Sequence, residues 1–581
     1  MKCFEFLTKK KSWDIMNNVC KYKFLVIDDI DLMEIHNLER KVNQAVKHPE
    51  PVVRLDAPWD QLKSDTFNYI NVVYDHEEQL FKMWYVVTGI RPGEKWERGR
   101  KTAYATSTDG INWEKPILNL VEVNGSKKNN YIFPEMLSLN YNIIIDPSDI
   151  PARRYKMIFD VESREDRWAG YHVPLCLAYS HDGIRWERPK HVNPVLRGVS
   201  DDLWGLIYDR DRRKYLLFTR RVPNIPRDLS LYESYDLIDW EDKGRVLVPD
   251  ENDPPEMFNL HGMAPFFYED FCLAMLGTMN FLPGAEVYSS NNRPPEDWPF
   301  KEIGAVDIQL SYSRDGREWS RPTDRSPIVS SGKDGELDRF IIPSRNGPIV
   351  LNGETWIYYS AHKNRHTAWS QEEVLSNESS DAREIAFCML AKMPEDHWVS
   401  LNAGESEGFF VCKPWGPPLG IFVNADAEGG SIQVELITPY GEPIPNFTRE
   451  ECIPITANGK DQEVKWKSGR LPIEFSLDYQ GGILAKFYLK NAKLYSYTFT
   501  LPDPDGQLER DQQNARWSDL ITHRSDVPGK ASTEPADGRP PVWKNQTKLY
   551  NNVAKQPRLN NPSWESGFLT IEDGEHGKNE D

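Results

Sequence analysis

The stretch "ATSTDGINWEKP" (residues 105–116) recurs as "AYSHDGIRWERP" (178–189) and again as "SYSRDGREWSRP" (311–322). All three copies keep Ser, Asp, Gly and Trp at the same offsets. An Asp-Gly pair between alternating apolar segments predicts a β-hairpin, because glycine accepts a positive φ and aspartate caps the turn. A fourth copy, "ESYDLIDWED" (233–242), keeps Ser, Asp and Trp without the glycine. We interpret each copy of this phrase as an outer hairpin anchored by its tryptophan, in which the aspartate stabilises the turn.

A second repeat is a pair of apolar strands bent around a polar turn. It occurs five times, at residues 69–87, 141–161, 203–222, 263–279 and 347–362. In four cases the phrase follows, and the two together predict a four-stranded antiparallel sheet. Five such sheets arranged radially predict a five-bladed β-propeller over residues 51–415, with loops of unequal length between blades.

The rest of the chain has a different texture. Residues 416–500 alternate with period two between Gly and Pro turns, which predicts a β-sandwich. Residues 501–581 are polar and aperiodic, and we expect an extended or irregular tail. Residues 1–50 contain "FLVIDDIDLMEI", and we expect this N-terminal extension to pack on the propeller. The predicted fold class is therefore all-β.

Charge and composition exclude several classes of partner. The formal net charge of −19 over 581 residues argues against binding to nucleic acid. No run of about 18 apolar residues occurs, so we expect no membrane partner. The N-terminus lacks a signal-peptide pattern, which favours a cytoplasmic location, or export if a leader has been lost. The seven cysteines form no CxxC pair, and we expect them to be buried and small rather than ligands.

The strand pairs, the Ser-x-Asp-Gly-x-x-Trp hairpins and the C-terminal sandwich together resemble the invertase/fructanase and arabinanase superfamily of glycoside hydrolases. They are most similar to bacterial proteins that resemble the invertase N-terminal domain. The resemblance covers roughly residues 20–500 and implies hydrolysis of glycosidic bonds by carboxylates at an axial pocket. The Trp-Met-Asn-Asp-Pro, Arg-Asp-Pro and Glu-Cys motifs of invertases are absent from the predicted propeller; the Glu-Cys of "EECIPI" (450–455) lies in the sandwich.

Candidate catalytic residues therefore have to be chosen by their position in the predicted fold, just upstream of each blade's innermost strand. Hydrolysis needs two carboxylates, one as nucleophile or base and one as acid. We expect Asp65 as nucleophile or base and Asp202 as general acid, with the roles open to exchange. Glu336 or Asp338 is the expected third carboxylate. A solvated loop carboxylate is an equally good interpretation of any one of them.

These positions, together with the ends of the following strands, supply candidate substrate-binding residues with polar, cationic or aromatic side chains. Arginines there suit a charged group on a sugar, although ordinary ion pairs explain them as well. The candidates are Trp59, Asp60, Asn140, Asp201, Trp204, Arg220, Arg221, His261, Arg339 and His362.

The predicted function is an exo-acting glycoside hydrolase on a plant or algal oligo- or polysaccharide. A glycoside phosphorylase, in which Arg220, Arg221 and His261 hold phosphate, is the first alternative, and a non-catalytic carbohydrate-binding propeller is the second. No cofactor and no metal ligand are predicted, although an axial calcium ion is compatible with the fold. The sequence does not define the oligomeric state.

Overall fold

The computed structural model describes residues 19–60, 66–88, 101–123, 125–133, 141–160, 173–189, 191–199, 203–220, 228–254, 257–282, 302–333, 335–363, 386–413, 415–475 and 482–503. These residues form strands β1 to β30 and two single 3-10 turns, η2 (Pro151–Arg153) and η4 (Pro472–Glu474). Their structure is all-β, as predicted. No helix among them is long and apolar enough to cross a membrane.

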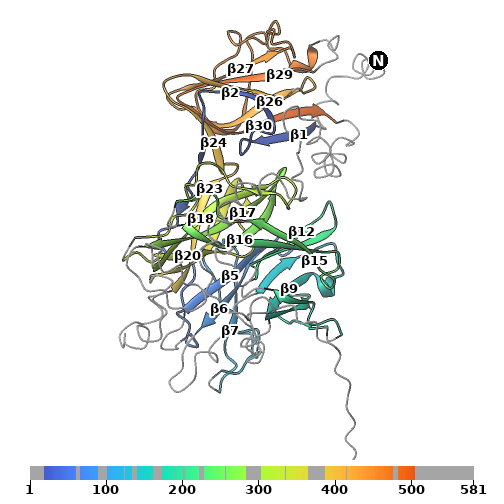
Figure 1. Cartoon of the computed structure of the whole chain (residues 1–581), viewed down its shortest axis with the longest axis vertical. Coiled ribbons are helices and arrows are strands. Elements are labelled where there is room, and N and C mark those ends of the chain that lie inside the picture. The colour runs from blue at the N-terminus through green and yellow to red at the C-terminus, as the bar shows by residue number, and fades with distance from the viewer. Residues whose placement is uncertain are drawn as a thin grey trace, which may run out of the picture.

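Five antiparallel sheets follow one another along the chain and form the lower body in Figure 1. The first holds β5 (Thr66–Asp75), β6 (Leu80–Thr88) and β7 (Lys101–Ser107). The second holds β8 (Tyr141–Ile145), β9 (Tyr155–Asp160), β10 (Val173–Ser180) and β11 (Leu196–Val199). The third holds β12 (Leu203–Asp209), β13 (Lys214–Thr219), β14 (Leu229–Ser234) and β15 (Glu241–Leu247).

The fourth sheet holds β16 (Met257–Tyr268), β17 (Phe271–Leu282), β18 (Glu302–Ser313) and β19 (Trp319–Ser320). The fifth holds β20 (Phe340–Pro343), β21 (Ile349–Leu351), β22 (Glu354–His362), β23 (Ala386–Pro394) and the N-terminal β4 (Val46–Lys47). Strand pairs are present at all five predicted places. In the fifth, the first strand begins earlier than predicted, at Phe340, and is interrupted between β20 and β21.

The repeated phrase forms the same hairpin in every copy. In the second sheet, Asp182 Oδ1 accepts the N–H groups of Ile184 and Arg185, at 2.8 Å each. Gly183 has φ 76°, and its carbonyl accepts the Trp186 indole N–H at 3.1 Å. The copy without glycine adopts the same turn with Leu237 at φ 68°. The predicted role of the aspartates as turn stabilisers is confirmed.

Each hairpin also docks on the preceding sheet, which explains why the phrase is repeated. Trp84 of β6 donates its indole N–H to the Gly183 carbonyl at 2.7 Å, joining the first sheet to the second. Tyr358 of β22 donates its hydroxyl to the Gly110 carbonyl at 2.7 Å, joining the fifth sheet to the first. The two other copies dock through apolar contacts: Leu237 shares a core with Ile158 of β9, and Gly316 lies against Leu216 of β13.

First strands of neighbouring sheets also touch. β5 contacts β8, β8 contacts β12, and β12 contacts β16, while β20 contacts β17 and β18 on one side and β5 on the other. Gly205 of β12 lies so close to β16 that a Cβ there would be 2.1 Å from Pro265 Cδ. The five sheets are thus connected in a circle, which we call the ring.

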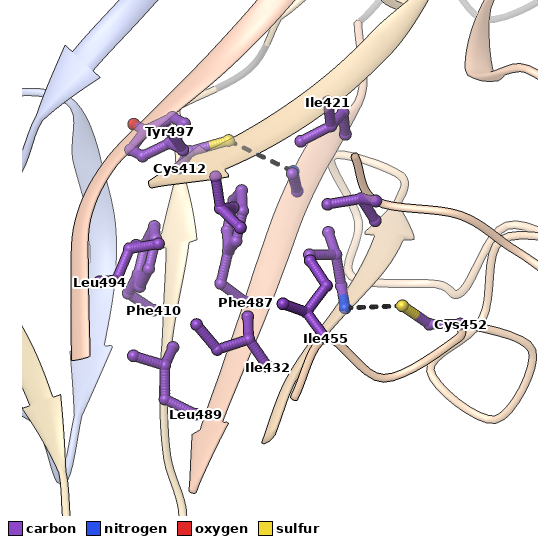
Figure 2. Close-up of a cluster of buried hydrophobic side chains, with 14 of the residues drawn as sticks. Phe410, Cys412, Ile421, Ile432, Cys452, Ile455, Phe487, Leu489, Leu494 and Tyr497 are labelled. Carbon is purple, nitrogen blue, oxygen red and sulfur yellow. Dashed lines mark hydrogen bonds between the residues drawn. The ribbon is translucent and has the colours of Figure 1, made fainter. Parts of the chain in front are cut away.

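A second unit, which we call the paired sheets, lies above the ring in Figure 1. One sheet holds β1 (Val19–Leu25), β3 (Glu39–Val42), β24 (Val399–Ala403), β26 (Gly420–Asp426), β28 (Asn458–Glu463) and β30 (Ala492–Pro502). The other holds β2 (Leu32–His36), β25 (Gly408–Cys412), β27 (Ser431–Ile437) and β29 (Leu484–Lys490). Alternate residues of both sheets fill one core (Figure 2), as the period-two pattern predicts.

The described cysteines are buried residues, as expected. Cys412 and Cys452 lie in this core, and their sulfurs accept the N–H groups of Ala485 at 3.3 Å and Val434 at 3.2 Å (Figure 2). All six cysteines in the described part of the chain are buried and free of disulfides.

The N-terminal segment packs on the ring through a core that Leu25, Ile27 and Val42 share with Phe266 and other ring residues, but most of its strands pair elsewhere. β1 pairs with β30, β2 with β25, and β3 with β24, so these strands belong to the paired sheets; only β4, beside β23, joins the ring. β24 and β25 also belong to the paired sheets although they precede residue 416. Alternation of apolar and polar residues shows that a segment is a strand. It does not show which strand the segment pairs with, because pairing depends on which sheet edge has unpaired backbone groups within reach. Residues 1–18, and the predicted tail beyond residue 503, lie outside the described ranges.

Candidate functional site

One end of the ring collects buried polar and cationic side chains. First strands begin at this end and second strands finish there, since neighbouring strands are antiparallel. Arg339 directly precedes β20, His362 ends β22, and Arg220 directly follows β13. His261 lies in the first half of β16. All four were predicted from the sequence, and each is at most 8% exposed. We call this end the mouth of the ring.

Two imidazoles flank one phenyl ring at the mouth. Phe340, the first residue of β20, is the register partner of His362, and their ring centroids are 5.7 Å apart. The His261 ring lies 6.2 Å from the same phenyl ring, at 80° to it. This array links the fourth sheet to the fifth. Both imidazoles are fully buried.

Below the mouth, polar side chains tie the first strands to one another. Asn71 of β5 donates to the Tyr141 carbonyl at 3.2 Å and accepts the Ile143 N–H at 3.1 Å, both on β8. Arg345, which is wholly buried, places its guanidinium 4.1 Å from the centre of the Tyr69 ring. These contacts hold the first, second and fifth sheets in fixed relation, so the groups at the mouth are mounted on rigid elements.

Two expected carboxylates are engaged in other contacts. Asp338 forms an ion pair of 2.6 Å with Lys47 of β4 and accepts the Tyr359 hydroxyl at 3.3 Å. Glu336 is exposed, and its Oε2 accepts the Lys333 N–H at 2.7 Å. These contacts give each carboxyl a structural role and add nothing to its assignment as a catalyst, which stays a prediction.

Trp59 and Asp60 brace the first sheet. Asp60 Oδ2 accepts a hydrogen bond from Lys115 Nζ at 2.7 Å and from the Ala57 N–H at 3.1 Å. Burial raises the pKa of the Asp60 carboxyl, and the charge of Lys115 opposes that shift. The Trp59 indole N–H donates to Asn130 at 2.8 Å. Both side chains are committed to protein contacts, so their assignment to substrate binding has no support from this geometry.

Five predicted site residues lie outside the described ranges: Asp65, Asn140, Asp201, Asp202 and Arg221. Trp204 lies in β12, but its side chain is not among those described. The principal acid and base candidates therefore stay predictions.

Three acids near this end, two of them buried and Asp307 half-buried, were missed by the sequence reasoning. Asp160 ends β9 and is 3% exposed, Asp228 forms an ion pair with Arg245, and Asp307 of β18 accepts two hydrogen bonds from Ser331. The available signal was an acid closing or entering an otherwise apolar strand, as in "MIFDV" (157–161). Within the described ranges, no three His, Cys, Asp or Glu side chains gather closely enough to hold a metal ion.

Comparison with known proteins identifies no family. No family model matches the chain, and no curated protein matches it. Among solved structures, a GH32 β-fructofuranosidase of Bombyx mori is 12% identical, with 81% of this chain and 94% of that chain covered and a TM-score of 0.36. A glycosyl hydrolase from Bacteroides ovatus is 11% identical over 60% and 94%, with a TM-score of 0.40.

An N-acetylgalactosamine deacetylase from F. plautii, in complex with blood group B trisaccharide, is 14% identical over 62% of this chain and 96% of that chain, with a TM-score of 0.39. At these TM-scores the likenesses do not carry an activity over to this chain.

Proposed function

We propose that this protein is a glycoside hydrolase in which the ring is a five-bladed β-propeller, the paired sheets are a β-sandwich, and the glycan binds at the mouth. The observation that carries the proposal is a shared position. Asp65, Asp202 and Arg339 each stand one residue before a first strand, those of β5, β12 and β20. Equivalent positions in a ring of sheets converge on one end, and the mouth is where the buried histidines and arginines gather.

In the proposed mechanism, Asp65 and Asp202 act on opposite sides of the scissile bond. One serves as nucleophile or base while the other, held protonated by its surroundings, donates a proton to the leaving oxygen. The cationic Arg220 and Arg339 at the mouth orient the sugar through hydrogen bonds. We favour an enzyme that works at chain ends, because a pocket at one end of a ring of sheets would admit the end of a glycan chain. The plant or algal origin of the substrate stays a sequence-based expectation.

The test is the release of product from aryl glycosides and from plant and algal polysaccharides. A positioned acid or base contributes roughly 10²- to 10⁴-fold to the rate, so we expect Asp65→Asn and Asp202→Asn each to lower kcat by that factor. Asp461→Asn, an exposed acid on the edge of the paired sheets, is the matched control and should leave kcat unchanged. Full activity in both mouth variants would exclude hydrolysis at this site and leave a non-catalytic, carbohydrate-binding ring.

Phosphorolysis is the second candidate because Arg220 and His261 are both buried at the mouth. An arginine and a histidine in the same site would suit binding of an inorganic phosphate nucleophile. Dependence of turnover on added phosphate, with a sugar phosphate as product, would favour it over hydrolysis. Turnover in phosphate-free buffer would exclude it.

A further inference from the structure

The seam between the fourth and fifth sheets has no copy of the repeated phrase. Between β23 and β24 the chain makes a different turn, in which Asp396 has φ 69°. The Tyr268 hydroxyl, at the end of β16, donates to Asp396 Oδ1 and accepts the Asp396 N–H at 3.2 Å. The Trp398 ring packs on Tyr268, with centroids 5.7 Å apart. This turn therefore makes the inter-sheet contact that the hairpins make elsewhere.

The same carboxylate also holds the paired sheets. Ser496 of β30 donates to Asp396 Oδ2 at 2.8 Å, and Asn424 of β26 donates to it at 3.3 Å. Lys23 of β1 lies 3.1 Å from Oδ1. Asp396 is 1% exposed, so its carboxylate is shielded from water. Figure 1 shows the place, where β24 leads from the ring into the paired sheets.

Few side chains are able to replace this one. A buried carboxylate is tolerated only when its oxygens are fully paired, and here the ring and the paired sheets each supply donors. Lys23 also pairs with Glu269 at 3.1 Å and Glu395 at 3.2 Å, so the joint has a positive centre surrounded by acids. If the ring or the paired sheets lose a hydrogen-bond donor to Asp396, the buried carboxylate is left partly unpaired. Its contacts with the other part are then weakened as well.

We propose that Asp396 is a joint that couples the unfolding of the ring to that of the paired sheets. The two parts then open as one unit, and the orientation of the paired sheets is fixed. The joint lies at the end of the ring opposite the mouth, because Tyr268 ends the same strand, β16, that carries His261 in its first half. The paired sheets are thereby held away from the mouth. This inference does not depend on the proposed enzymatic activity.

Hydrogen exchange of the full chain, followed by mass spectrometry, tests the coupling. Tyr268→Phe removes a donor on the ring side, and Ser496→Ala removes one on the side of the paired sheets. A hydrogen bond to a charged group corresponds to roughly a tenfold to hundredfold change in an opening equilibrium. We expect Tyr268→Phe to lower the protection of β26 and β30 by about tenfold, and Ser496→Ala to lower that of β16 and β17 similarly.

Tyr215→Phe is the matched control, because it breaks a buried tyrosine–aspartate bond of 2.7 Å, to Asp146, inside the ring. It should lower protection in the ring and leave β26 and β30 unchanged. If Tyr268→Phe and Ser496→Ala each act only on their own side, the joint does not exist. If the control lowers β30 as much as Tyr268→Phe does, the coupling does not pass through Asp396. Should one joint variant fail to fold, the other still decides.

Discussion

Gly110→Ala tests the docking of a hairpin on the neighbouring sheet, which is the contact that closes the ring. A Cβ at this position would lie 2.6 Å from the Tyr358 hydroxyl and 2.7 Å from the Trp356 ring. Three costs add. The left-handed backbone at φ 73° costs alanine about 1–2 kcal/mol, overpacking costs about 1–3 kcal/mol, and displacement of the Tyr358 hydrogen bond costs about 1 kcal/mol. We expect a loss of about 3–6 kcal/mol in the free energy of unfolding.

Gly353→Ala separates the backbone cost from the docking cost. Gly353 has φ 80°, and no atom lies within 4 Å of a Cβ built there, so only the left-handed penalty of about 1–2 kcal/mol applies. Urea unfolding, followed by tryptophan fluorescence, measures both variants against the parent protein. Equal destabilisation by the two substitutions would refute the view that the first hairpin is tightly docked on the fifth sheet.

Three further predictions concern the ring. Gly205→Ala should destabilise strongly, by pushing β12 off β16, whereas Gly404→Ala, with open space around its Cβ, should change the thermal midpoint little. Trp84→Phe removes the donor to the Gly183 carbonyl, which keeps its second donor, and should cost about 1 kcal/mol plus the volume lost, as read from the urea midpoint. Burial acts to raise the pKa of Asp182, but hydrogen bonds from backbone N–H groups lower it overall. Its stabilising effect is therefore complete above the unfolded value of about 3.9 and is lost as the pH falls through the folded pKa. Asp182→Asn should flatten the fall in thermal midpoint between about pH 5 and 2, and an unchanged slope would contradict this.

In the repeated phrase, neighbouring residues determine the turn, whereas a distant residue determines the docking. Asp182 and Gly183 adopt the predicted turn because the capping carboxylate and the positive φ are properties of neighbouring residues. The partner of the Gly183 carbonyl, Trp84, lies 99 residues away, and no offset in the sequence connects the two. The docking that orders the sheets was therefore not predictable.

The position of the candidate site could be predicted from the sequence, but the contacts of its residues could not. Choosing residues just before each first strand led to Arg339 and close to His261, because the start of a strand in a ring of sheets is a geometric landmark. Asp338 satisfied the same rule, yet it pairs with Lys47, a residue of β4 nearly 300 positions away. This ion pair depends on the length of the lysine side chain and on the position of the N-terminal strand beside the ring. Neither can be inferred from the sequence pattern.

The sequence by itself determined the all-β class, the five strand pairs and the hairpin turns, since each depends on contacts between residues that are close in the sequence. Only the tertiary structure decided that β1 to β3 belong with the C-terminal strands and that Asp396 replaces the missing hairpin. Both are choices among distant partners of similar chemistry. They are settled by which buried backbone and carboxylate groups would otherwise stay unpaired.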